Sequence, residues 1–392
     1  MELTNEEREM LEGKLGNAVK KSMEILVALG EIYGAKRLID VKSVQVAGVS
    51  YKNLGEAGLE FLDEMAKDGK VKIVTTLNPA GMDIEKWQEL GIEEGFAKNQ
   101  KRVIDTFSKM GIITVCTCTP YFVGNNPGFG ESVAWSESSA VAFANSVIGA
   151  KTNREGGPSA LASALTGKTP EYGMHIEKNR QAEVLVNVDA EITETTDFGA
   201  LGYVIGNDIK NKIPLIRGIN KASIEQLKSL SASIATFGGT ALFHIEGITP
   251  NKTNVPSEKI NVSQEDIDKA KKALTDEGEV DFVSIGCPHC SLNELKLVAE
   301  KIEGKKAKIP FWITVARPIK NMADLAGYVK IIEDSGAKIV CDTCLVVAPL
   351  KGKFNTIATT SAKGCYYGRG SNNFRTKIMS LDNCVKTAVG EK

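Results

Sequence analysis

The eight cysteines of this chain are spaced in a way that could hold a metal centre. None precedes residue 116, and none lies in the long stretch between residues 118 and 287. Cysteines that only filled a core would scatter more evenly along the chain. Most of the thiols fall into three groups, which are Cys116 with Cys118, Cys287 with Cys290, and Cys341 with Cys344. Cys365 and Cys384 stand apart from these groups and are interpreted as bystanders.

Three interpretations of these thiols follow from the residues alone. Two C-x-x-C pairs, at 287/290 and 341/344, have the formal spacing of a four-cysteine zinc site. The thiols could instead be plain buried side chains. The third interpretation is an iron–sulfur cluster held by thiolates from distant loops. A catalytic cluster needs three protein thiolates and one open iron that acts as a Lewis acid, and one cysteine from each group would supply them.

The elements around the cysteines alternate between strands and helices. Short apolar runs predict strands over residues 43–50, 71–77, 112–116, 184–188, 241–245, 281–285, 311–315 and 338–341. Amphipathic spacing predicts helices over residues 54–67, 84–90, 99–110, 133–148, 223–235, 264–274, 292–302 and 322–335, after a long amino-terminal helix capped by Thr4 and Glu7. This alternation predicts α/β layers with mainly parallel sheets.

The residues that could do chemistry come directly after predicted strands. Gly48, Val49 and Ser50 follow the first strand, and Asn78 and Pro79 follow the second. Cys118, Cys287 and Cys344 also follow strands. Ligands of parallel sheets bind beyond the carboxyl ends of the strands, so we expect these residues to converge at one edge.

Composition excludes several classes of protein. The 48 basic and 49 acidic residues are well mixed and leave a net charge of −1, which gives no nucleic-acid or membrane footprint. Hydrophobic residues make up 42% of the chain, enough for a sizeable core. The acidic amino terminus is no signal peptide, and no apolar stretch is long enough to cross a membrane, so a cytoplasmic protein is expected. The length predicts two to three lobes, set at 1–120, 121–255 and 256–392.

Four segments make the sequence similar to a known family. They are residues 117–121 (TCTPY), 130–157 (GESVAWSESSAVAFANSVIGAKTNREGG), 285–289 (IGCPH) and 342–344 (DTC). These segments resemble those of the aconitase X family, and the resemblance spans nearly the whole chain, from Gly48 to residues 360–364. It implies an aconitase-like fold of layered α/β/α lobes without the swivelling domain.

The resemblance also implies a set of site residues. A three-cysteine cluster would be held by Cys118, Cys287 and Cys344, whereas Cys116, Cys290 and Cys341 would be neighbours. The implied substrate-binding residues are Gly48, Val49, Ser50, Asn78, Pro79, Glu137, Ser138 and Lys363, of which Glu137 and Lys363 are also the catalytic candidates. Backbone amides at residues 48–50 could cradle an anion, and Lys363 could pair with a carboxylate or phosphate. Arg154 is a further candidate anion clamp and ranks below Lys363.

The activity that the resemblance implies is the removal of water from a small hydroxy-carboxylate. No convincing base is found in this chain, and in aconitase-like enzymes a serine on the swivelling domain takes that role. The sequence therefore predicts a separate small subunit that carries the serine. This split form implies dehydration of (R)-5-phosphomevalonate to trans-anhydromevalonate 5-phosphate, with a [4Fe-4S] cluster.

Other assignments stay open from the sequence. The first is cis-3-hydroxy-L-proline dehydration, which in the family goes with a [2Fe-2S] cluster. Three cysteines are also compatible with a [3Fe-4S] centre. An alternative of another class is a non-enzymatic scaffold stabilised by zinc or by a cluster.

Overall fold

The first lobe is built on a four-stranded parallel sheet in a computed structural model that describes residues 1–391. Its strand order is β4-β3-β2-β5. The strands are β2 (Ser43–Val46), β3 (Val74–Leu77), β4 (Ile113–Cys116) and β5 (Ala134–Trp135). Apolar side chains of three helices pack against them, namely α3 (Tyr51–Met65), α4 (Glu94–Lys109) and α6 (Gly157–Thr166). This burial of apolar surface on the sheet is what stabilises the lobe.

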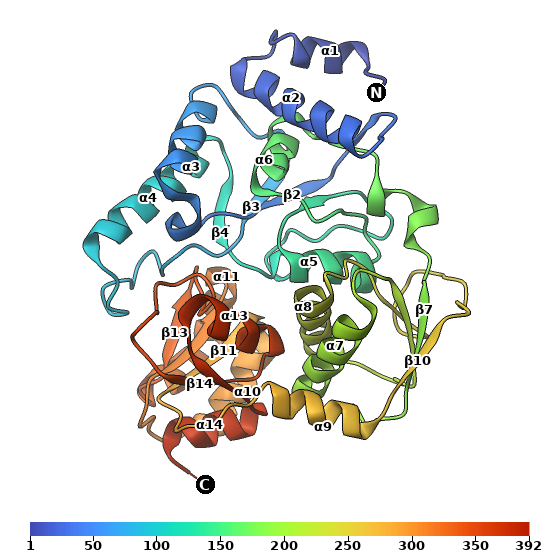
Figure 1. Cartoon of the computed structure of the whole chain (residues 1–392). Coiled ribbons are helices and arrows are strands. Elements are labelled where there is room, and N and C mark those ends of the chain that lie inside the picture. The colour runs from blue at the N-terminus through green and yellow to red at the C-terminus, as the bar shows by residue number, and fades with distance from the viewer. Residues whose placement is uncertain (392) are drawn as a thin grey trace.

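Shorter elements complete the first lobe. The amino-terminal helices α1 (Asn5–Leu11) and α2 (Asn17–Ile32) pack on each other, and α2 packs on α6. Strand β1 (Leu38–Asp40) pairs antiparallel with β6 (Lys168–Pro170). Helix α5 (Ser138–Phe143) follows β5 and runs into a π-helical turn over Ala144–Ile148. It lies where the three lobes meet (Figure 1).

The second lobe has the strand order β10-β7-β8-β9. The strands are β7 (Val184–Val188), β8 (Pro214–Arg217), β9 (His244–Ile245) and β10 (Lys259–Val262). Helices α7 (Thr195–Ile209), α8 (Ile224–Gly238) and α9 (Gln264–Ala273) lie beside this sheet. Helix α8 starts at a capping box, in which Ser223 and Gln226 satisfy each other's backbone N–H groups.

The third lobe has a five-stranded sheet in the order β13-β12-β11-β14-β15. The strands are β11 (Phe282–Cys290), β12 (Phe311–Val315), β13 (Lys338–Cys341), β14 (Thr356–Thr359) and β15 (Arg375–Ile378). The helices are α10 (Leu292–Ile302), α11 (Arg317–Leu325), α12 (Tyr328–Asp334), α13 (Ala362–Asn372) and α14 (Leu381–Val389). Every residue of β11 and β12 is buried, as expected for central strands covered on both faces.

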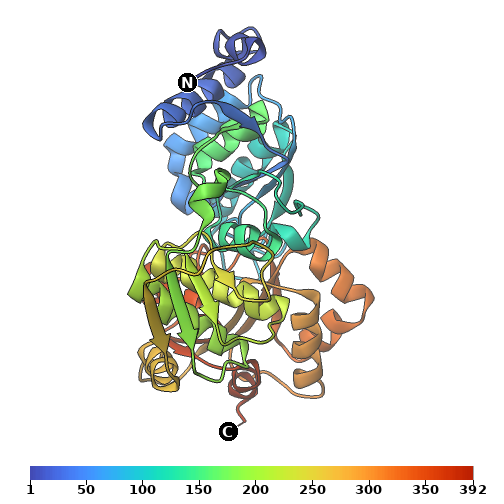
Figure 2. The same ribbon diagram turned by 90° about the vertical axis from the view of Figure 1, so that its right-hand side faces the viewer.

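The three lobes form a triangle in which the first lies above the other two (Figures 1 and 2). The second and third lobes lie side by side, with α8 and α13 near their boundary. Every strand pairing within the three sheets is parallel. The predicted layered α/β fold with mainly parallel sheets is therefore confirmed.

The structure corrects several predicted elements. Residues 84–90 form turns and no helix, and the Asp83 carboxylate accepts the N–H groups of Glu85 and Lys86 at 3.0 Å. In the segment 133–148 a strand comes first, since β5 pairs with β2. The predicted amino-terminal helix is broken at Gly13 and Gly16, and the one at 322–335 is broken at Gly327; all three glycines have positive φ angles. Strands β1, β6, β10, β14 and β15 were not predicted.

The three sheets place the boundaries between lobes at other residues than those predicted. A boundary at 120/121 would remove β5 from the first sheet, and one at 255/256 would remove β10 from the second. Strand pairing therefore places the changes of lobe between β6 and β7 and between α9 and β11. Within residues 1–391, no helix is long and apolar enough to cross a membrane.

Candidate functional site

The loops that carry the three predicted cluster cysteines lie at the carboxyl ends of their strands. Cys118 follows β4 in the first lobe, whereas Cys344 follows β13 in the third. Cys287 lies in the distal half of β11, where the register with β12 shifts between Ile285 and Cys290. All three thiols are buried, with exposed fractions of 6 to 8%. Two lobes therefore contribute to one buried group of loops.

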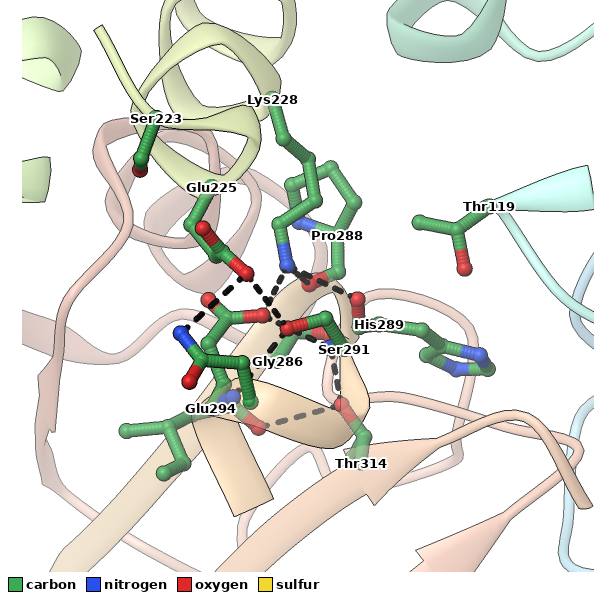
Figure 3. Close-up of polar contacts among 12 residues, drawn as sticks. Thr119, Ser223, Glu225, Lys228, Gly286, Pro288, His289, Ser291, Glu294 and Thr314 are labelled. Atoms are coloured by element: carbon green, nitrogen blue, oxygen red, sulfur yellow. Dashed lines mark hydrogen bonds and ion pairs between the residues drawn. The ribbon is translucent and has the colours of Figure 1, made fainter. Parts of the chain in front are cut away.

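The backbone beside Cys287 requires a glycine. Gly286 has a φ of 97°, and a Cβ at this position would lie 2.3 Å from the carbonyl oxygen of Thr314. The Thr314 hydroxyl donates to the Gly286 carbonyl at 2.7 Å, and both residues are visible in Figure 3. Close approach to β12 thus fixes the point at which the chain turns toward the cysteine.

His289, two residues after Cys287, contacts the loops of the other two cysteines. Its backbone N–H donates to the Cys118 sulfur at 3.2 Å. Its ring Nδ1 lies 3.0 Å from the Thr117 hydroxyl, and its Nε2 lies 3.0 Å from the Thr343 carbonyl oxygen. The side chain is fully buried, and burial lowers the pKa of His289 to about 4, so the ring is neutral.

The three thiols affect one another's ionisation. Burial raises the pKa of each thiol. For Cys118 and Cys344, the charge of another thiol raises the pKa further. A charge on Cys344 raises the pKa of Cys118 further, and a charge on Cys287 helps to raise that of Cys344 to about 12. The Lys363 ammonium lowers the pKa of all three thiols. These thiols therefore form one electrostatic group around a single cation.

The thiols suit a cluster better than a single ion. No set of three or more His, Cys, Asp or Glu side chains among residues 1–391 is arranged to hold one metal ion. A zinc ion needs all its ligand atoms about 2.3 Å from one point, whereas each thiolate of an iron–sulfur cluster binds a different iron. Two buried oxygens nearby, Asn78 Oδ1 and Thr343 Oγ1, have no hydrogen-bond partner among residues 1–391. Thiols from three loops and unpartnered polar atoms are consistent with a bound polar group.

Glu137 and Lys363 form a buried ion pair between the first and third lobes. We call this boundary the first seam. Glu137 caps the start of α5, and Lys363 lies in the first turn of α13. The Asn78 amide donates to Glu137 Oε2 at 2.9 Å, and the Ser139 hydroxyl donates to Oε1 at 3.0 Å. Three of the predicted site residues, from β3, α5 and α13, are therefore in direct contact.

The pair stays ionised despite its burial. Burial by itself raises the pKa of Glu137, but the charge and hydrogen bond of Lys363 and the donors Asn78 and Ser139 outweigh it and lower the pKa. Burial likewise lowers the pKa of Lys363, but the charges of Glu137 and of the thiols raise it above the ordinary value. The site therefore holds a fixed positive charge next to the cysteine loops.

Residues 48–50 form the short loop between β2 and α3. Gly48 has a φ of 81°, in the left-handed region that favours glycine. Val49 and Ser50 are buried, and the Ser50 hydroxyl donates to the Val347 carbonyl of the third lobe at 3.4 Å. Within residues 1–391, the backbone N–H groups of these three residues have no hydrogen-bond acceptor. Such free amides next to a left-handed residue are typical of an anion-binding turn.

The remaining predicted site residues have fewer contacts. Pro79 is buried and extends the chain from Asn78. Ser138 is half-buried at the start of α5. The Arg154 side chain is exposed and makes no hydrogen bond or ion pair with any other residue of the segment 1–391. The structure thus places Ser138 beside Glu137 but does not bring Arg154 into the buried group.

The second and third lobes meet at a different buried lysine, and we call this boundary the second seam. Lys228 of α8 donates to the carbonyl oxygen of His289 at 2.9 Å and to that of Pro288 at 3.5 Å. It also pairs with Glu294, which accepts the Ser291 backbone N–H at 2.7 Å. Figure 3 shows the ammonium pointing into the loop, with the His289 ring on the opposite side.

An arginine joins the first and third lobes at the Cys344 loop. Arg317 pairs with Asp83 of the first lobe at 3.0 Å and also with Asp342. The second oxygen of Asp83 accepts the Cys341 backbone N–H at 2.8 Å. Burial raises the pKa of Asp342 to about 6 although Arg317 opposes this shift. The arginine therefore bridges two buried carboxylates, one from each side of the boundary.

The other cysteines lie around this group: burial raises the pKa of Cys365 to about 12, and the charge of Cys287 adds to this shift. The pKa of Cys116 and that of Cys341 are raised by burial and by Asp342, and that of Cys290 by burial and by Glu294. Cys365 and Cys384 lie in apolar clusters of the third lobe.

Reasoning from the sequence missed His289, Lys228 and Arg317. The signal for His289 was its place directly after Cys287 and Pro288. Lys228 lies at a buried position of a helix rich in small residues, where a lysine is unusual. For Arg317 the sequence holds no comparable signal, because its two partners are far away in the chain.

Family models match almost the whole chain. They are the first domain of aconitase X at residues 1–178, the second domain at 182–272 and the third domain at 280–390.

Curated relatives and a solved structure agree with this match. The phosphomevalonate dehydratase large subunit of Methanocaldococcus jannaschii is 47% identical, over 94% of this chain and 95% of that protein. The cis-3-hydroxy-L-proline dehydratase of Hypocrea jecorina is 32% identical, over 99% of this chain and 68% of that protein. A crystal structure of the holo-form of aconitase X from Thermococcus kodakaraensis is 45% identical, with a TM-score of 0.93 over 99% of this chain and all of that one.

Proposed function

This chain belongs to the aconitase X family, and from that premise we propose that it is the large subunit of a phosphomevalonate dehydratase. The reaction is the dehydration of (R)-5-phosphomevalonate to trans-anhydromevalonate 5-phosphate. The observation that carries the proposal is the buried Glu137–Lys363 pair next to three cysteine loops, in a chain 44 to 47% identical to four archaeal proteins of that name.

The second candidate substrate, cis-3-hydroxy-L-proline, has weaker support. The two relatives named for it are 31 and 32% identical, and this chain covers 68 to 69% of their length. The relatives named for phosphomevalonate are covered over 94 to 100% of their length. The higher sequence identity and the fuller coverage of those relatives thus favour the phosphorylated substrate.

The proposed cofactor is a [4Fe-4S] cluster held by Cys118, Cys287 and Cys344. The thiol donor set fits it, because the three loops lie at strand ends of two lobes and share the cation Lys363. When bound, such a cluster supplies an open iron that acts as a Lewis acid toward the hydroxyl and carboxylate of the substrate. The same three thiols would also accommodate a [3Fe-4S] or [2Fe-2S] centre.

The chain's own residues bind and orient the substrate in this proposal. Lys363 presents a fixed positive charge to a carboxylate or phosphate, and its amine is held by Glu137, which itself accepts a hydrogen bond from Asn78. Ser138 lies directly beside Glu137. The amides of Gly48, Val49 and Ser50 bind an anionic group, and Pro79 fixes the path of the chain after Asn78. Burial of these groups keeps competing water away from the charge.

The proton acceptor is assigned to a partner. Curated relatives carry the name large subunit, which implies a small one. We infer that the partner is a swivelling domain with a catalytic serine that removes the proton α to the carboxylate.

An anaerobic dehydration assay of the reconstituted two-chain complex on both substrates tests the proposal. We expect turnover of phosphomevalonate with the complex and none with either subunit alone. Serine variants of Cys118, Cys287 and Cys344 should lose iron, sulfide and activity, whereas the matched control Cys365→Ser keeps them. Turnover of hydroxyproline alone would reassign the substrate, and a fully active isolated chain would overturn the two-subunit assignment.

A further inference from the structure

We propose that His289 is the positioning residue that locks the three cysteine loops together, and this inference rests on the proposed cluster function. Its imidazole and its backbone N–H together contact Thr117, Cys118 and Thr343. Thr117 and Cys118 lie in the Cys118 loop, and Thr343 lies in the Cys344 loop. His289 itself belongs to the segment that follows Cys287. The residue is fully buried, so water cannot replace these bonds.

The direction of each hydrogen bond follows from the partners. The Thr343 carbonyl oxygen can only accept, so Nε2 of His289 carries the proton and donates. A neutral ring then offers Nδ1 as an acceptor, and the Thr117 hydroxyl donates to it. The Thr117 oxygen in turn accepts the backbone N–H and the hydroxyl of Thr119, each at 3.1 Å. One tautomer therefore satisfies the whole chain of bonds from the first lobe to the third.

Lys228 of the second seam also holds the segment that follows Cys287. Lys228 donates to the His289 carbonyl oxygen and to that of Pro288, on the side away from the ring (Figure 3). With its carbonyl, its N–H and both ring nitrogens bonded, His289 has no polar atom left to reorient. The peptide that follows Cys287 is thus fixed by the second lobe and the ring by the first and third.

A residue with these contacts sets the positions of the thiolates without binding the cluster. Groups that hold metal ligands in place are typically worth 10- to 100-fold in metal affinity. His289 differs from an ordinary buried histidine such as His244, whose Nε2 contacts the Arg180 carbonyl at 2.8 Å in the segment that joins the first and second lobes. His244 is therefore a matched control for the cost of replacing a buried imidazole.

The test uses His289→Gln, His289→Asn and His289→Leu in the full chain, with His244→Gln as the control. Glutamine places a donor near the position of Nε2, and asparagine places an acceptor near that of Nδ1. Each variant therefore keeps one of the two hydrogen bonds of the ring. After anaerobic reconstitution with the small subunit, iron release to a chelator and the EPR spectrum of the reduced cluster are measured. We expect release about 10- to 100-fold faster for leucine, smaller increases for glutamine and asparagine, and altered EPR spectra for all three.

His244→Gln should release iron at the wild-type rate with the wild-type spectrum. Wild-type release and spectra in all three His289 variants would overturn the proposal, as would equally fast release from His244→Gln.

A second measurement on the cluster-free chain separates this inference from the proposed function. Alkylation rates of individual thiols, read by peptide mass spectrometry, report how firmly the loops are held. We expect faster alkylation of Cys118 and Cys344 in the His289 variants, with Cys365 and Cys384 unchanged as internal references. If the wild-type complex binds no iron or sulfide, the cluster assignment fails, and the alkylation rates still decide whether His289 holds the loops. Unchanged rates would reject that role.

Discussion

The two seams of the molecule each contain a buried lysine–carboxylate pair, but the pairs are built differently. At the first seam, the partners of Lys363 are the side chains of Glu137 and Ser139. At the second seam, Lys228 also bonds to two backbone carbonyl oxygens, and Glu294 caps its own helix through the Ser291 N–H. The Glu294 side chain is 20% exposed, whereas that of Glu137 is 12% exposed.

This difference distinguishes a lysine that can bind substrate from a lysine that holds the backbone in position. A lysine held only by side chains keeps its charge available to an incoming anion, because side chains can rearrange around the anion. A lysine bonded to carbonyl oxygens of the loop after Cys287 fixes the path of the backbone. We therefore assign substrate binding to the first seam and loop positioning to the second, although both pairs look alike in sequence.

The largest expected effect is that of Lys363→Met at the first seam. It removes the charge that faces the substrate, so kcat should fall about 10²- to 10³-fold in the reconstituted complex. It also leaves Glu137 buried without a cation, which should cost about 3–5 kcal/mol in the free energy of unfolding. Adding Glu137→Gln should restore much of the stability and none of the activity. A double variant that regains activity would contradict the assignment of substrate binding to Lys363.

Lys228→Met at the second seam should have a smaller effect of another kind. Glu294 keeps its Ser291 hydrogen bond and some water, so the loss is mainly that of the two carbonyl contacts, about 1–3 kcal/mol in urea unfolding. The complex should hold less iron, but its activity per bound iron should match that of the wild type. A loss of activity per iron as large as that of Lys363→Met would show that the two seams do not differ in role.

The pH dependence of stability should also report on one member of each carboxylate–lysine pair. The pKa of Glu137 is lowered, so its contribution is complete above the ordinary value of about 4.3 and is lost as pH falls through the depressed value. The pKa of Lys228 is raised, so its contribution is complete below about 10.4 and is lost as pH rises through the raised value.

Urea unfolding of the cluster-free chain at a series of pH values measures both losses. Glu137→Gln should flatten the acid side of the stability curve, and Lys228→Met should flatten the alkaline side. Each change amounts to about 1.4 kcal/mol per unit of pKa shift. An unaltered acid side in Glu137→Gln would contradict an ionised, paired Glu137.

The smallest expected effect is that of Ser291→Ala beside the second seam. Ser291 caps α10 by accepting the Glu294 N–H at 3.1 Å and donates its hydroxyl to Glu225 at 2.9 Å. Loss of such a cap typically costs about 1 kcal/mol, measured by urea unfolding. We expect no change in kcat, and a fall in kcat would mean that the second seam also shapes the reacting groups.

Local sequence patterns predicted the parts of this molecule that depend on neighbouring residues. Continuous apolar runs gave the strands at 184–188, 311–315 and 338–341 with their observed bounds, and capping residues gave the starts of α1 and α9. The helix predicted at 84–90 is absent, and Asp83 just before this segment bonds across lobes to Arg317 and Cys341. A pattern within ten residues contains no information on such a partner.

The candidate site was predictable for a related reason. Strand ends in parallel sheets point to one edge, so residues after strands can be grouped from their positions in the chain alone. That rule placed Asn78 and the cysteines, and the resemblance added Glu137 and Lys363. It could not reveal His289 or Lys228 as connectors, because their partners depend on how three separate sheets are oriented. Arg154 shows the converse, since a suitable residue type in a suitable motif lies exposed in the folded chain.

The first-seam pair has a consequence for the order of events during synthesis. Glu137 and Lys363 are 226 residues apart in the chain. At translation rates of about 5–20 residues per second, the carboxylate leaves the ribosome roughly 10–45 s before its lysine does. During that interval Glu137 has no lysine beside it, and only Asn78 and Ser139 of its own lobe can bond to its carboxylate. The ion pair that joins the first and third lobes can therefore form only after Lys363 has been synthesised.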